Sequence, residues 1–463
     1  MKTINIFFIR TFMALMFLYS MNSCDSFVDV DLPTSQLTKT SVFEDYRTTD
    51  AALTDIYSKI RDRGLLTGAR TGISNHLGNY TDELMAYGAA SNTSWSYFNN
   101  TLVPVQADIS EYWNSAYNQI YAANSIIEGT ENSAALNELN KKQLKGESLF
   151  IRALVHFYLT NLFGDVPYIQ DTDYKENSTA TKIPQNEVYK LIITDLQNAI
   201  LLLPEQYSSA ERVRPNKYTA KALLARVYLY SDAFAEASNE ASSVLNMTDT
   251  FTLTQNTNQV FLIGSKETIW QLKPSATGQN TKEGSTFIIV AGPPSTCGLT
   301  TSLVNSFASE DRRRINWIKS VTSGSSTWYF SYKYKERTTT SPSREYSIVF
   351  RLSELFLIRA EARARQGDLI GAKEDLNLIR QRAGLSDSPA VSKEEVLEAV
   401  LQERRWELFT EFGHRFFDLK RFDKINSVLS SVKPGWNSDD KLLPIPEREL
   451  RTNPKLGSQN PGY

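Results

Sequence analysis

The stretch from residue 348 to residue 422 constrains the fold of this chain most strongly, because its apolar residues recur with the period of paired helices. In its first part, apolar side chains recur at steps of three and four on both sides of Gly367, which interrupts the pattern. Gly384 then stands where a left-handed residue commonly ends a helix. Ser392 and Glu395 have the spacing of a capping box at the start of a further helix. The stretch therefore predicts a helical hairpin followed by a third helix.

The energies involved indicate that these helices depend on packing. A helix cap contributes about 1 kcal/mol, and an exposed ion pair one helical turn apart contributes about 0.3–0.5 kcal/mol. Burying four large apolar side chains contributes roughly 6–12 kcal/mol before entropy is subtracted. We therefore expect the helices to be stable only when they stack on other helices.

A second segment, residues 217–245, has the same pattern. When Ala237 is aligned with Ala372, small residues fall at the positions where two helices would approach each other, which is typical of tetratricopeptide pairs. The two copies lie about 135 residues apart, whereas a regular array repeats every ~34 residues. The sequence therefore predicts degenerate helical pairs that are separated by other segments, rather than a plain solenoid.

Helical and irregular stretches alternate along the rest of the chain. The irregular stretches contain many Gly, Ser, Thr and Asn residues together with aromatic residues, and in the second of them short β-prone runs replace the helical period. Helical pairs are expected mainly in residues 40–62, 109–163, 185–246 and 348–422, and the irregular stretches are residues 64–100 and 250–347.

The first residues have the composition of an export signal. Lys2 and Arg10 give a positive start, and a short apolar run follows. The run is too short for a membrane span. Cys24 comes directly after it, followed by polar residues, which resembles the cleavage site of a bacterial lipoprotein. The alternative is an ordinary signal peptide that happens to contain a cysteine. We predict that residues 1–23 are removed and that Cys24 carries a lipid.

The charge balance and the few reactive residues argue against several functions. The chain has 50 basic and 52 acidic residues, and its net charge of −2 gives no support for nucleic-acid binding. If Cys24 carries a lipid, Cys297 has no cysteine partner, so a disulfide framework is excluded. His76, His156 and His414 lie far apart, and no metal-ligand, phosphate-loop or hydrolase motif occurs. We therefore expect no metal and no cofactor.

Nine motifs together resemble those of the SusD/RagB family of nutrient-uptake lipoproteins of Bacteroidetes. They occur in the order typical of the family and cover essentially the whole mature chain. The motifs are Cys24 after the leader, TTDAALTDIYSKIRD, TDE at residues 81–83, IRALVHFYLTNLFGDVPY, EDRRR at residues 310–314, RLSELFLIRAEARARQGD, LNLIRQRAGL, ERRWELFTEFGHRFFDLKRF and LLPIPERELRTNPKLGSQNPGY.

The resemblance implies a mainly α-helical fold, in which degenerate tetratricopeptide pairs form a right-handed superhelical scaffold with irregular loop and short-β insertions. It implies one such domain over residues 24–463, after the leader. The implied protein is lipid-anchored on the surface of the outer membrane. Its partner would be a SusC-like TonB-dependent transporter, to which it delivers an oligosaccharide that it has captured without cutting it.

A protein that captures sugars needs aromatic rings against the C–H faces of the sugar, surrounded by groups that bind hydroxyls. A tryptophan that removes about 100 Å² of apolar surface from water contributes roughly 2.5 kcal/mol. Two such rings with a few hydrogen bonds, less the ordering costs, correspond to about millimolar to micromolar binding. The candidate ligand-binding residues are Asn79, Asp82, Trp95 and Tyr97 in the first irregular stretch, and Trp317, Trp328 and Tyr329 in the second.

Each of these residues also has a structural interpretation. Trp95 and Trp317 could each be a half-buried packing residue. Asp82 could bind a loop amide instead of a sugar. Trp328 and Tyr329 lie in an alternating run and could pack within a strand.

Other charged or reactive residues are expected to be structural. We expect the arginines at residues 312–314 to pair with Asp311 and other acidic residues. His414 follows a helix-breaking glycine among core aromatic residues, which favours a buried histidine over a catalytic base. Glu407 and Glu411 lie one helical turn apart, and we expect them in an ion-pair network of the helical core.

Four functions remain, of which the first is favoured. The first is a glycan-capturing lipoprotein of an import complex, and the second is a RagB-like lipoprotein that captures peptides for the same kind of complex. Peptides can be bound through backbone pairing without aromatic rings, so the exposed aromatic residues favour sugars. The third is a glycoside hydrolase, which would need two carboxylates about 5–9 Å apart. The fourth is a scaffold that binds protein tails, and the long non-helical insertion argues against it.

Overall fold

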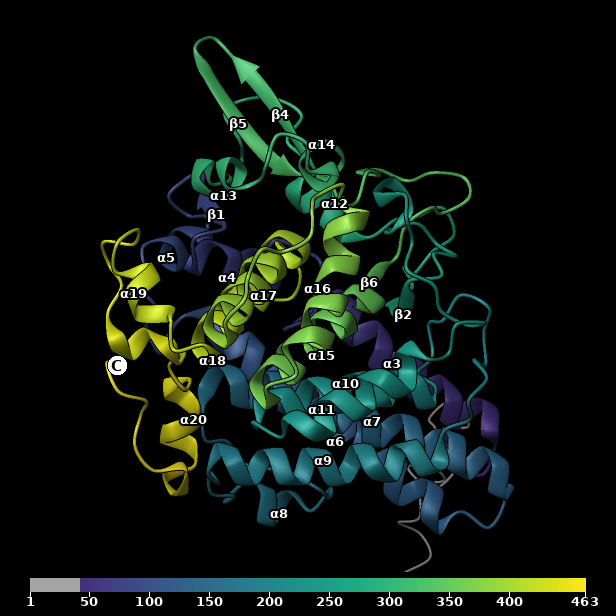
Figure 1. Cartoon of the computed structure of the whole chain (residues 1–463). Helices are drawn as coiled ribbons and strands as arrows, with labels where there is room; N and C mark the ends of the chain where they lie inside the picture. Colours follow the sequence, from purple (N-terminus) through teal and green to yellow (C-terminus); the bar gives the residue numbers. More distant parts are fainter. Residues whose placement is uncertain (1–41) are drawn as a thin grey trace, which may run out of the picture. The chain divides into compact units, whose positions relative to one another are not determined.

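Long helices that pack on one another in chain order form most of the molecule (Figure 1). The computed structural model describes residues 42–463, of which residues 43–463 form one compact unit. The predicted leader and Cys24 lie outside the described residues. The stacked helices are α3 (Tyr46–Asp62), α6 (Ala107–Asn132), α7 (Glu138–Phe163), α9 (Gln185–Leu202), α10 (Lys217–Tyr230), α11 (Phe234–Leu245), α15 (Leu352–Gln366), α16 (Leu369–Arg382) and α17 (Lys393–Leu408).

Shorter helices connect or cover these long ones. They are α4 (Ile73–Tyr80), α5 (Ser94–Phe98), α8 (Tyr174–Asn177), α12 (Lys282–Phe287), α13 (Thr301–Ser306), α14 (Arg312–Trp317), α18 (His414–Arg421), α19 (Ile425–Leu429) and α20 (Glu447–Thr452). The mainly α-helical class that the sequence predicts is confirmed.

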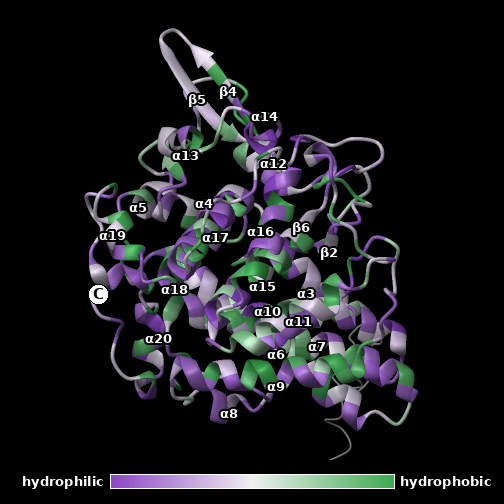
Figure 2. Ribbon diagram, in the orientation of Figure 1, coloured by the Kyte–Doolittle hydropathy of each residue, from purple (hydrophilic) through white to green (hydrophobic). Residues whose placement is uncertain are grey.

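Local sequence signals fix several helix ends, as predicted. Gly367 ends α15 in the left-handed region, with φ of +92°, where glycine has no steric penalty. Ser392 and Glu395 form the predicted capping box at the start of α17. The outermost helices owe their position to amphipathic packing. In Figure 2, α9 shows alternating hydrophobic and hydrophilic bands, as expected for a helix with one buried face.

The second irregular stretch supplies most of the strands. A four-stranded antiparallel sheet has the order β1 (Leu84–Ala86), β3 (Cys297–Leu299), β5 (Ser326–Ser331) and β4 (Ile318–Ser323), and β2 (Thr268–Leu272) pairs with β6 (Ser347–Arg351). The β4–β5 hairpin projects from the top of the view in Figure 1. One β-prone run, residues 286–290, is not a strand, because its first residues complete α12.

A buried charge network joins the helices to the insertion. Glu407 of α17 lies 2.5 Å from both Arg351 Nη1 and Arg382 Nη2, and 3.2 Å from Arg313 Nη1. Glu411 lies 2.9 Å from Arg351 Nη2. Burial alone would raise the pKa of Glu407, but the three guanidinium groups hold it well below its usual value. The ion-pair network predicted for Glu407 and Glu411 is therefore confirmed.

The C-terminal tail packs on a helix from the first half of the chain. The buried side chain of Asn460 donates hydrogen bonds to the carbonyl oxygens of Phe163 and Leu443, at 2.9 and 2.7 Å. The Leu443 amide donates to the carbonyl oxygen of Leu162 at 2.8 Å. The tail thus satisfies backbone carbonyls at the end of α7 that the helix itself leaves without a partner.

Candidate functional site

One face of the four-stranded sheet carries apolar side chains that are open to solvent. Leu84, Leu299 and Tyr329 form a row across β1, β3 and β5, and this row packs on a hydrophobic core cluster. Because successive side chains of a strand alternate between faces, the neighbouring residues point away from that core. We name this second surface the outer sheet face; its residues are Met85, Tyr87, Gly298 and Trp328, and the buried Phe330 lies on the same side of β5.

The Trp328 ring has one covered side. Gly292 lies in the loop between α12 and β3. A Cβ atom placed on Gly292 would lie 2.1 Å from the Trp328 ring, so the backbone of this loop lies directly against the ring. The side chain of Trp328 is nevertheless only half-buried. The loop therefore supports the ring and leaves part of it available to a ligand.

Tyr87 is held in a similar way next to Gly298. A Cβ atom on Gly298 would lie 3.4 Å from the Tyr87 ring, and Tyr87 is half-buried. The Tyr87 amide donates to the carbonyl oxygen of Thr296 at 2.8 Å, which extends the pairing of β1 with β3. Met85, two positions before Tyr87, is more exposed, at 38%.

Helix α5 adds a third ring beside β1. Trp95 is half-buried and its ring meets the Phe98 ring edge to face, with centroids 5.9 Å apart. Asn92 holds the start of this helix against the sheet, because its amide donates to the carbonyl oxygens of Tyr87 and Thr296 at 2.7 and 3.0 Å. The irregular stretches therefore present three half-exposed rings, Tyr87, Trp95 and Trp328, on adjoining elements.

Burial corrects the prediction for Trp317. Its side chain has no solvent exposure, and its indole Nε1 donates to the carbonyl oxygen of Thr257 at 2.8 Å. The Lys333 ammonium lies 5.1 Å from the Trp317 ring centroid. Trp317 is thus a core residue at the end of α14 and offers no ring to a ligand.

Asn79 and Tyr97 are likewise enclosed, contrary to the prediction of ligand contact. Asn79 donates to the carbonyl oxygen of Asn75 at 2.8 Å and has no exposed surface. Tyr97 stacks on the ring of His76, with centroids 3.9 Å apart, and burial raises its pKa well above the usual value. Tyr329 faces the core side of the sheet, so strand packing explains it.

Asp82 has a structural set of partners. Its carboxylate lies 2.8 Å from Arg405 Nη2 and 2.9 Å from Arg415 Nε. Burial opposes ionisation, but these two arginines hold the pKa of Asp82 below its usual value. The adjacent Glu83 lacks such partners, and burial together with the nearby Asp82 charge raises its pKa to about 7. The interpretation of Asp82 as a direct sugar ligand is therefore not supported by its geometry.

The remaining reactive residues have structural surroundings. Arg313 pairs with Asp311 at 2.8 Å, as expected for the arginines of residues 312–314. His414 is buried, and burial followed by nearby cationic side chains lowers its pKa well below the usual value. Cys297 lies buried in β3, and burial raises its pKa to about 12. These environments suit packing rather than acid–base or nucleophilic chemistry.

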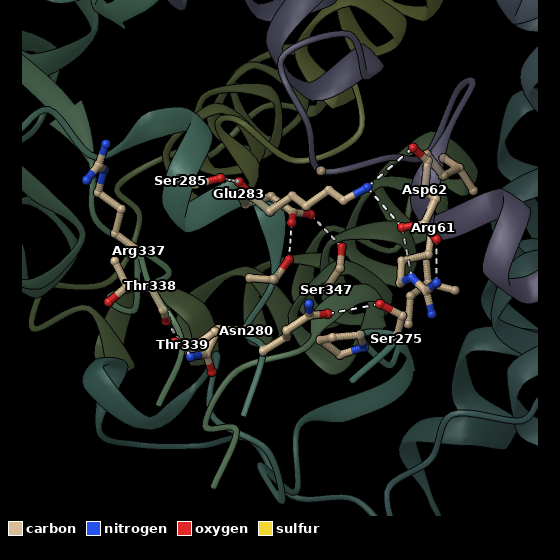
Figure 3. Close-up of a pocket in the computed structure, with 17 residues that line it drawn as sticks. Arg61, Asp62, Ser275, Asn280, Glu283, Ser285, Arg337, Thr338, Thr339 and Ser347 are labelled. Carbon is tan, nitrogen blue, oxygen red and sulfur yellow. Dashed lines mark hydrogen bonds and ion pairs between the residues drawn. The ribbon is translucent and has the colours of Figure 1, made fainter. Parts of the chain in front are cut away.

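A polar cavity of about 490 Å³ lies between the end of α3, the residues around α12 and the segment that leads into β6 (Figure 3). On one side, the Lys282 ammonium lies 2.9 Å from Asp62 Oδ1, and Arg61 also pairs with Asp62. Glu283 is buried and accepts hydrogen bonds from the hydroxyl groups of Thr281 and Ser347. No sequence pattern groups these residues, which lie up to almost three hundred positions apart.

The described residues show no metal cluster and no membrane helix. Between residues 42 and 463, no three His, Cys, Asp or Glu side chains lie together in a way that could hold a metal ion. Within the same range, no helix combines the length and apolar character that are needed to cross a bilayer.

Sequence comparison relates nearly the whole chain to one family. A family model described as "Starch-binding associating with outer membrane" matches residues 27–229, and a model described as "SusD family" matches residues 296–463. SusD-like protein P2 of Formosa agariphila is 30% identical over 413 residues, which cover 77% of this chain and 81% of that protein.

Solved structures share the fold. A structure titled "Laminarin binding SusD-like protein" is 26% identical, covers 90% of this chain and 99% of that chain, and has a TM-score of 0.76. Surface glycan-binding protein A from Bacteroides thetaiotaomicron, in complex with laminarihexaose, is 19% identical with a TM-score of 0.75 and covers 89% of this chain and 99% of that chain. The second likeness concerns the fold alone.

Proposed function

Because this chain belongs to the SusD/RagB family, we propose that it is a glycan-binding lipoprotein of the outer cell surface. It captures an oligosaccharide on the outer sheet face and delivers it to a SusC-like TonB-dependent transporter, without cutting the chain of sugars. The family model that mentions the outer membrane supports the location. The related structure whose title describes laminarin binding supports a glycan as the ligand.

The observation that carries this proposal is the set of half-exposed rings, Tyr87, Trp95 and Trp328. Each stands on an element that the fold holds in place, and Trp328 and Tyr87 lie against glycine backbone. Fixed rings bind the C–H faces of sugars with little loss of side-chain entropy. Two rings that each contribute roughly 2.5 kcal/mol give about micromolar to millimolar affinity after the ordering costs. Such an affinity allows the ligand to be passed on.

The test is calorimetric titration of the purified protein with a panel of oligosaccharides that includes laminarin fragments. We expect Trp328→Ala and Tyr87→Ala each to weaken binding about tenfold or more, with a midpoint of thermal unfolding within about 4 °C of wild type. Tyr174→Ala is the matched control, because Tyr174 is 72% exposed on α8, outside the outer sheet face. Unchanged affinity in both ring variants would contradict the proposed site.

Two further readouts separate the alternatives. Chromatography of the titrated oligosaccharides should show chains of unchanged length, since cleavage would indicate a hydrolase. A pool of peptides serves as the second ligand class, and binding of peptides without any glycan would favour the RagB-like function.

The lipid anchor has its own test. Replacing Cys24 with Ser should move the protein from the membrane fraction to the soluble fraction of cells that export it, because the lipid would have no attachment site. Retention of the Cys24→Ser variant in the membrane fraction would contradict anchoring at this residue.

A further inference from the structure

The polar cavity of Figure 3 differs in chemistry from the outer sheet face. No Trp, Tyr, Phe or His side chain is among the residues that line it. Its walls instead carry hydroxyl groups from Ser275, Thr281, Ser285, Thr338, Thr339 and Ser347. The volume of about 490 Å³ falls within the range of about 300–1,000 Å³ that is typical of small-molecule sites. None of the residues of the outer sheet face lines this cavity, so the two surfaces are separate.

The charges around the cavity are unequal. Arg61 and Lys282 share a single carboxylate, Asp62. Figure 3 shows Arg337 on the opposite side of the cavity from Arg61 and Asp62. Within residues 42–463, Arg337 is exposed, and no carboxylate lies within ion-pair distance of its guanidinium group. Two cationic side chains therefore share one carboxylate on one side of the cavity, and a third stands on the other without a carboxylate partner among the described residues.

With the carboxyl group of Glu283 counted, the cavity wall still carries three cationic side chains against two carboxyl groups. Glu283 is 4% exposed and has hydroxyl groups as its hydrogen-bond partners. Burial is the main cause that raises its pKa, which favours the protonated form. A protonated carboxyl group can both donate to and accept from hydroxyl groups. Figure 3 shows Glu283 and Ser347 between the two charged sides.

We propose that this cavity is a second ligand site, which takes a sugar unit that carries an anionic group. Arg337, which has no carboxylate partner in the described part of the chain, contacts the anionic group, and Glu283 and Ser347 bind the hydroxyl groups of the sugar. The anionic group is a carboxylate or a sulfate ester, and both would be recognised by the same guanidinium group. The site does not depend on the outer sheet face, so it can exist whether or not the rings bind glycans.

Saturation-transfer NMR with the full protein tests this site with four probes at millimolar concentration: glucuronic acid, glucose 6-sulfate, glucose and inorganic sulfate. We expect one or both acidic sugars to bind at least tenfold more tightly than glucose, because an ionised partner strengthens the hydrogen bonds. The comparison of the two acidic sugars identifies carboxylate or sulfate as the source of the charge. Inorganic sulfate should bind more weakly than the acidic sugars, since it lacks the hydroxyl groups.

Substitutions then locate the site. Arg337→Ala should weaken binding of the acidic sugar about tenfold. Arg451→Ala, which removes an exposed arginine of α20, and Trp328→Ala, which removes a ring of the outer sheet face, should leave it unchanged. Equal binding of glucose and the acidic sugars, or no binding of either acidic sugar, would overturn the proposal. Loss of acidic-sugar binding in Trp328→Ala alone would overturn it too, by assigning that ligand to the outer sheet face.

Discussion

Because Gly292 lies against Trp328, adding a methyl group at residue 292 should disturb the position of that ring on the outer sheet face. A Cβ atom at residue 292 would lie 2.1 Å from the Trp328 ring, so Gly292→Ala must displace the ring. We expect oligosaccharide affinity to fall by about tenfold or more, since most of one ring contact of roughly 2.5 kcal/mol is lost. Titration of the variant measures this effect. Ser325→Ala is the control, because Ser325 lies at the exposed tip of the β4–β5 hairpin that carries Trp328, and it should bind oligosaccharide as wild type does. An unaltered affinity in Gly292→Ala would mean that the position of the Trp328 ring does not affect binding.

Glu83 gives the molecule a stability that depends on pH. Its folded pKa of about 7 lies above the ordinary value of 4.5, so the folded state retains a proton that the unfolded state loses. Its contribution is therefore fully present below about pH 4.5 and is lost as the pH rises towards 7. The isosteric Glu83→Gln does not titrate. Its free energy of unfolding relative to wild type should increase by about 3 kcal/mol between pH 4.5 and pH 8.

Urea unfolding at several pH values measures this difference. Glu111→Gln is the control, because Glu111 is an exposed residue of α6, and its difference from wild type should stay nearly constant with pH. A constant difference for Glu83→Gln as well would show that Glu83 is ionised normally in the folded protein.

Single residues are also where sequence reasoning reached its limit. Trp317 and Trp328 both lie in an irregular stretch, yet only Trp328 is open to solvent. Burial of Trp317 depends on α14 packing beside residues near 257, some sixty positions away. Tyr87 was missed, although the alternation in LMAY at residues 84–87 is a signal that could have placed Met85 and Tyr87 on one face.

At the scale of elements, Glu407 connects α17 to α16, α14 and β6. It is the shared partner of Arg313, Arg351 and Arg382, and all four side chains are buried. Glu407→Gln removes the negative charge and leaves three guanidinium groups insufficiently neutralised. We expect a loss of about 3–5 kcal/mol in the free energy of unfolding, measured by chemical denaturation.

Glu398→Gln on the same helix is the control for this substitution. Its side chain is 61% exposed and lies 3.2 Å from Lys424, and removing such a pair should cost about 1 kcal/mol or less. Similar losses in both variants would indicate that the buried network adds little to stability.

The helices could be predicted because their signals are local. The period of apolar residues, Gly367, and the pair Ser392 and Glu395 all lie within the segments whose structure they determine. The outer sheet face depends instead on the register that aligns Met85 with Gly298 across more than two hundred residues. No local pattern specifies such a pairing, and the polar cavity was not foreseen for the same reason.

At the scale of the whole molecule, Asn460 links the last residues to the first half of the chain. Its side-chain amide donates hydrogen bonds to the carbonyl oxygens of Phe163 and Leu443. Asn460→Ala leaves both without this partner, so we expect a loss of about 1–3 kcal/mol in the free energy of unfolding. Calorimetry should still show one transition if the tail unfolds with the helices, and Ser458→Ala, at an exposed position, should match wild type. A separate early transition in wild type would contradict this coupling.

The attachment of Asn460 to α7 also bears on when the protein can finish folding. The hydrogen bond to Phe163 spans 297 residues. The end of α7 therefore cannot complete its contacts until the ribosome has made a segment that comes much later in the chain. Until that segment has been synthesised, this part of the helix stack lacks one of its closing contacts. The proposed location at the cell surface would require the chain to cross a secretion channel unfolded, and this late contact would then form only after the tail has crossed.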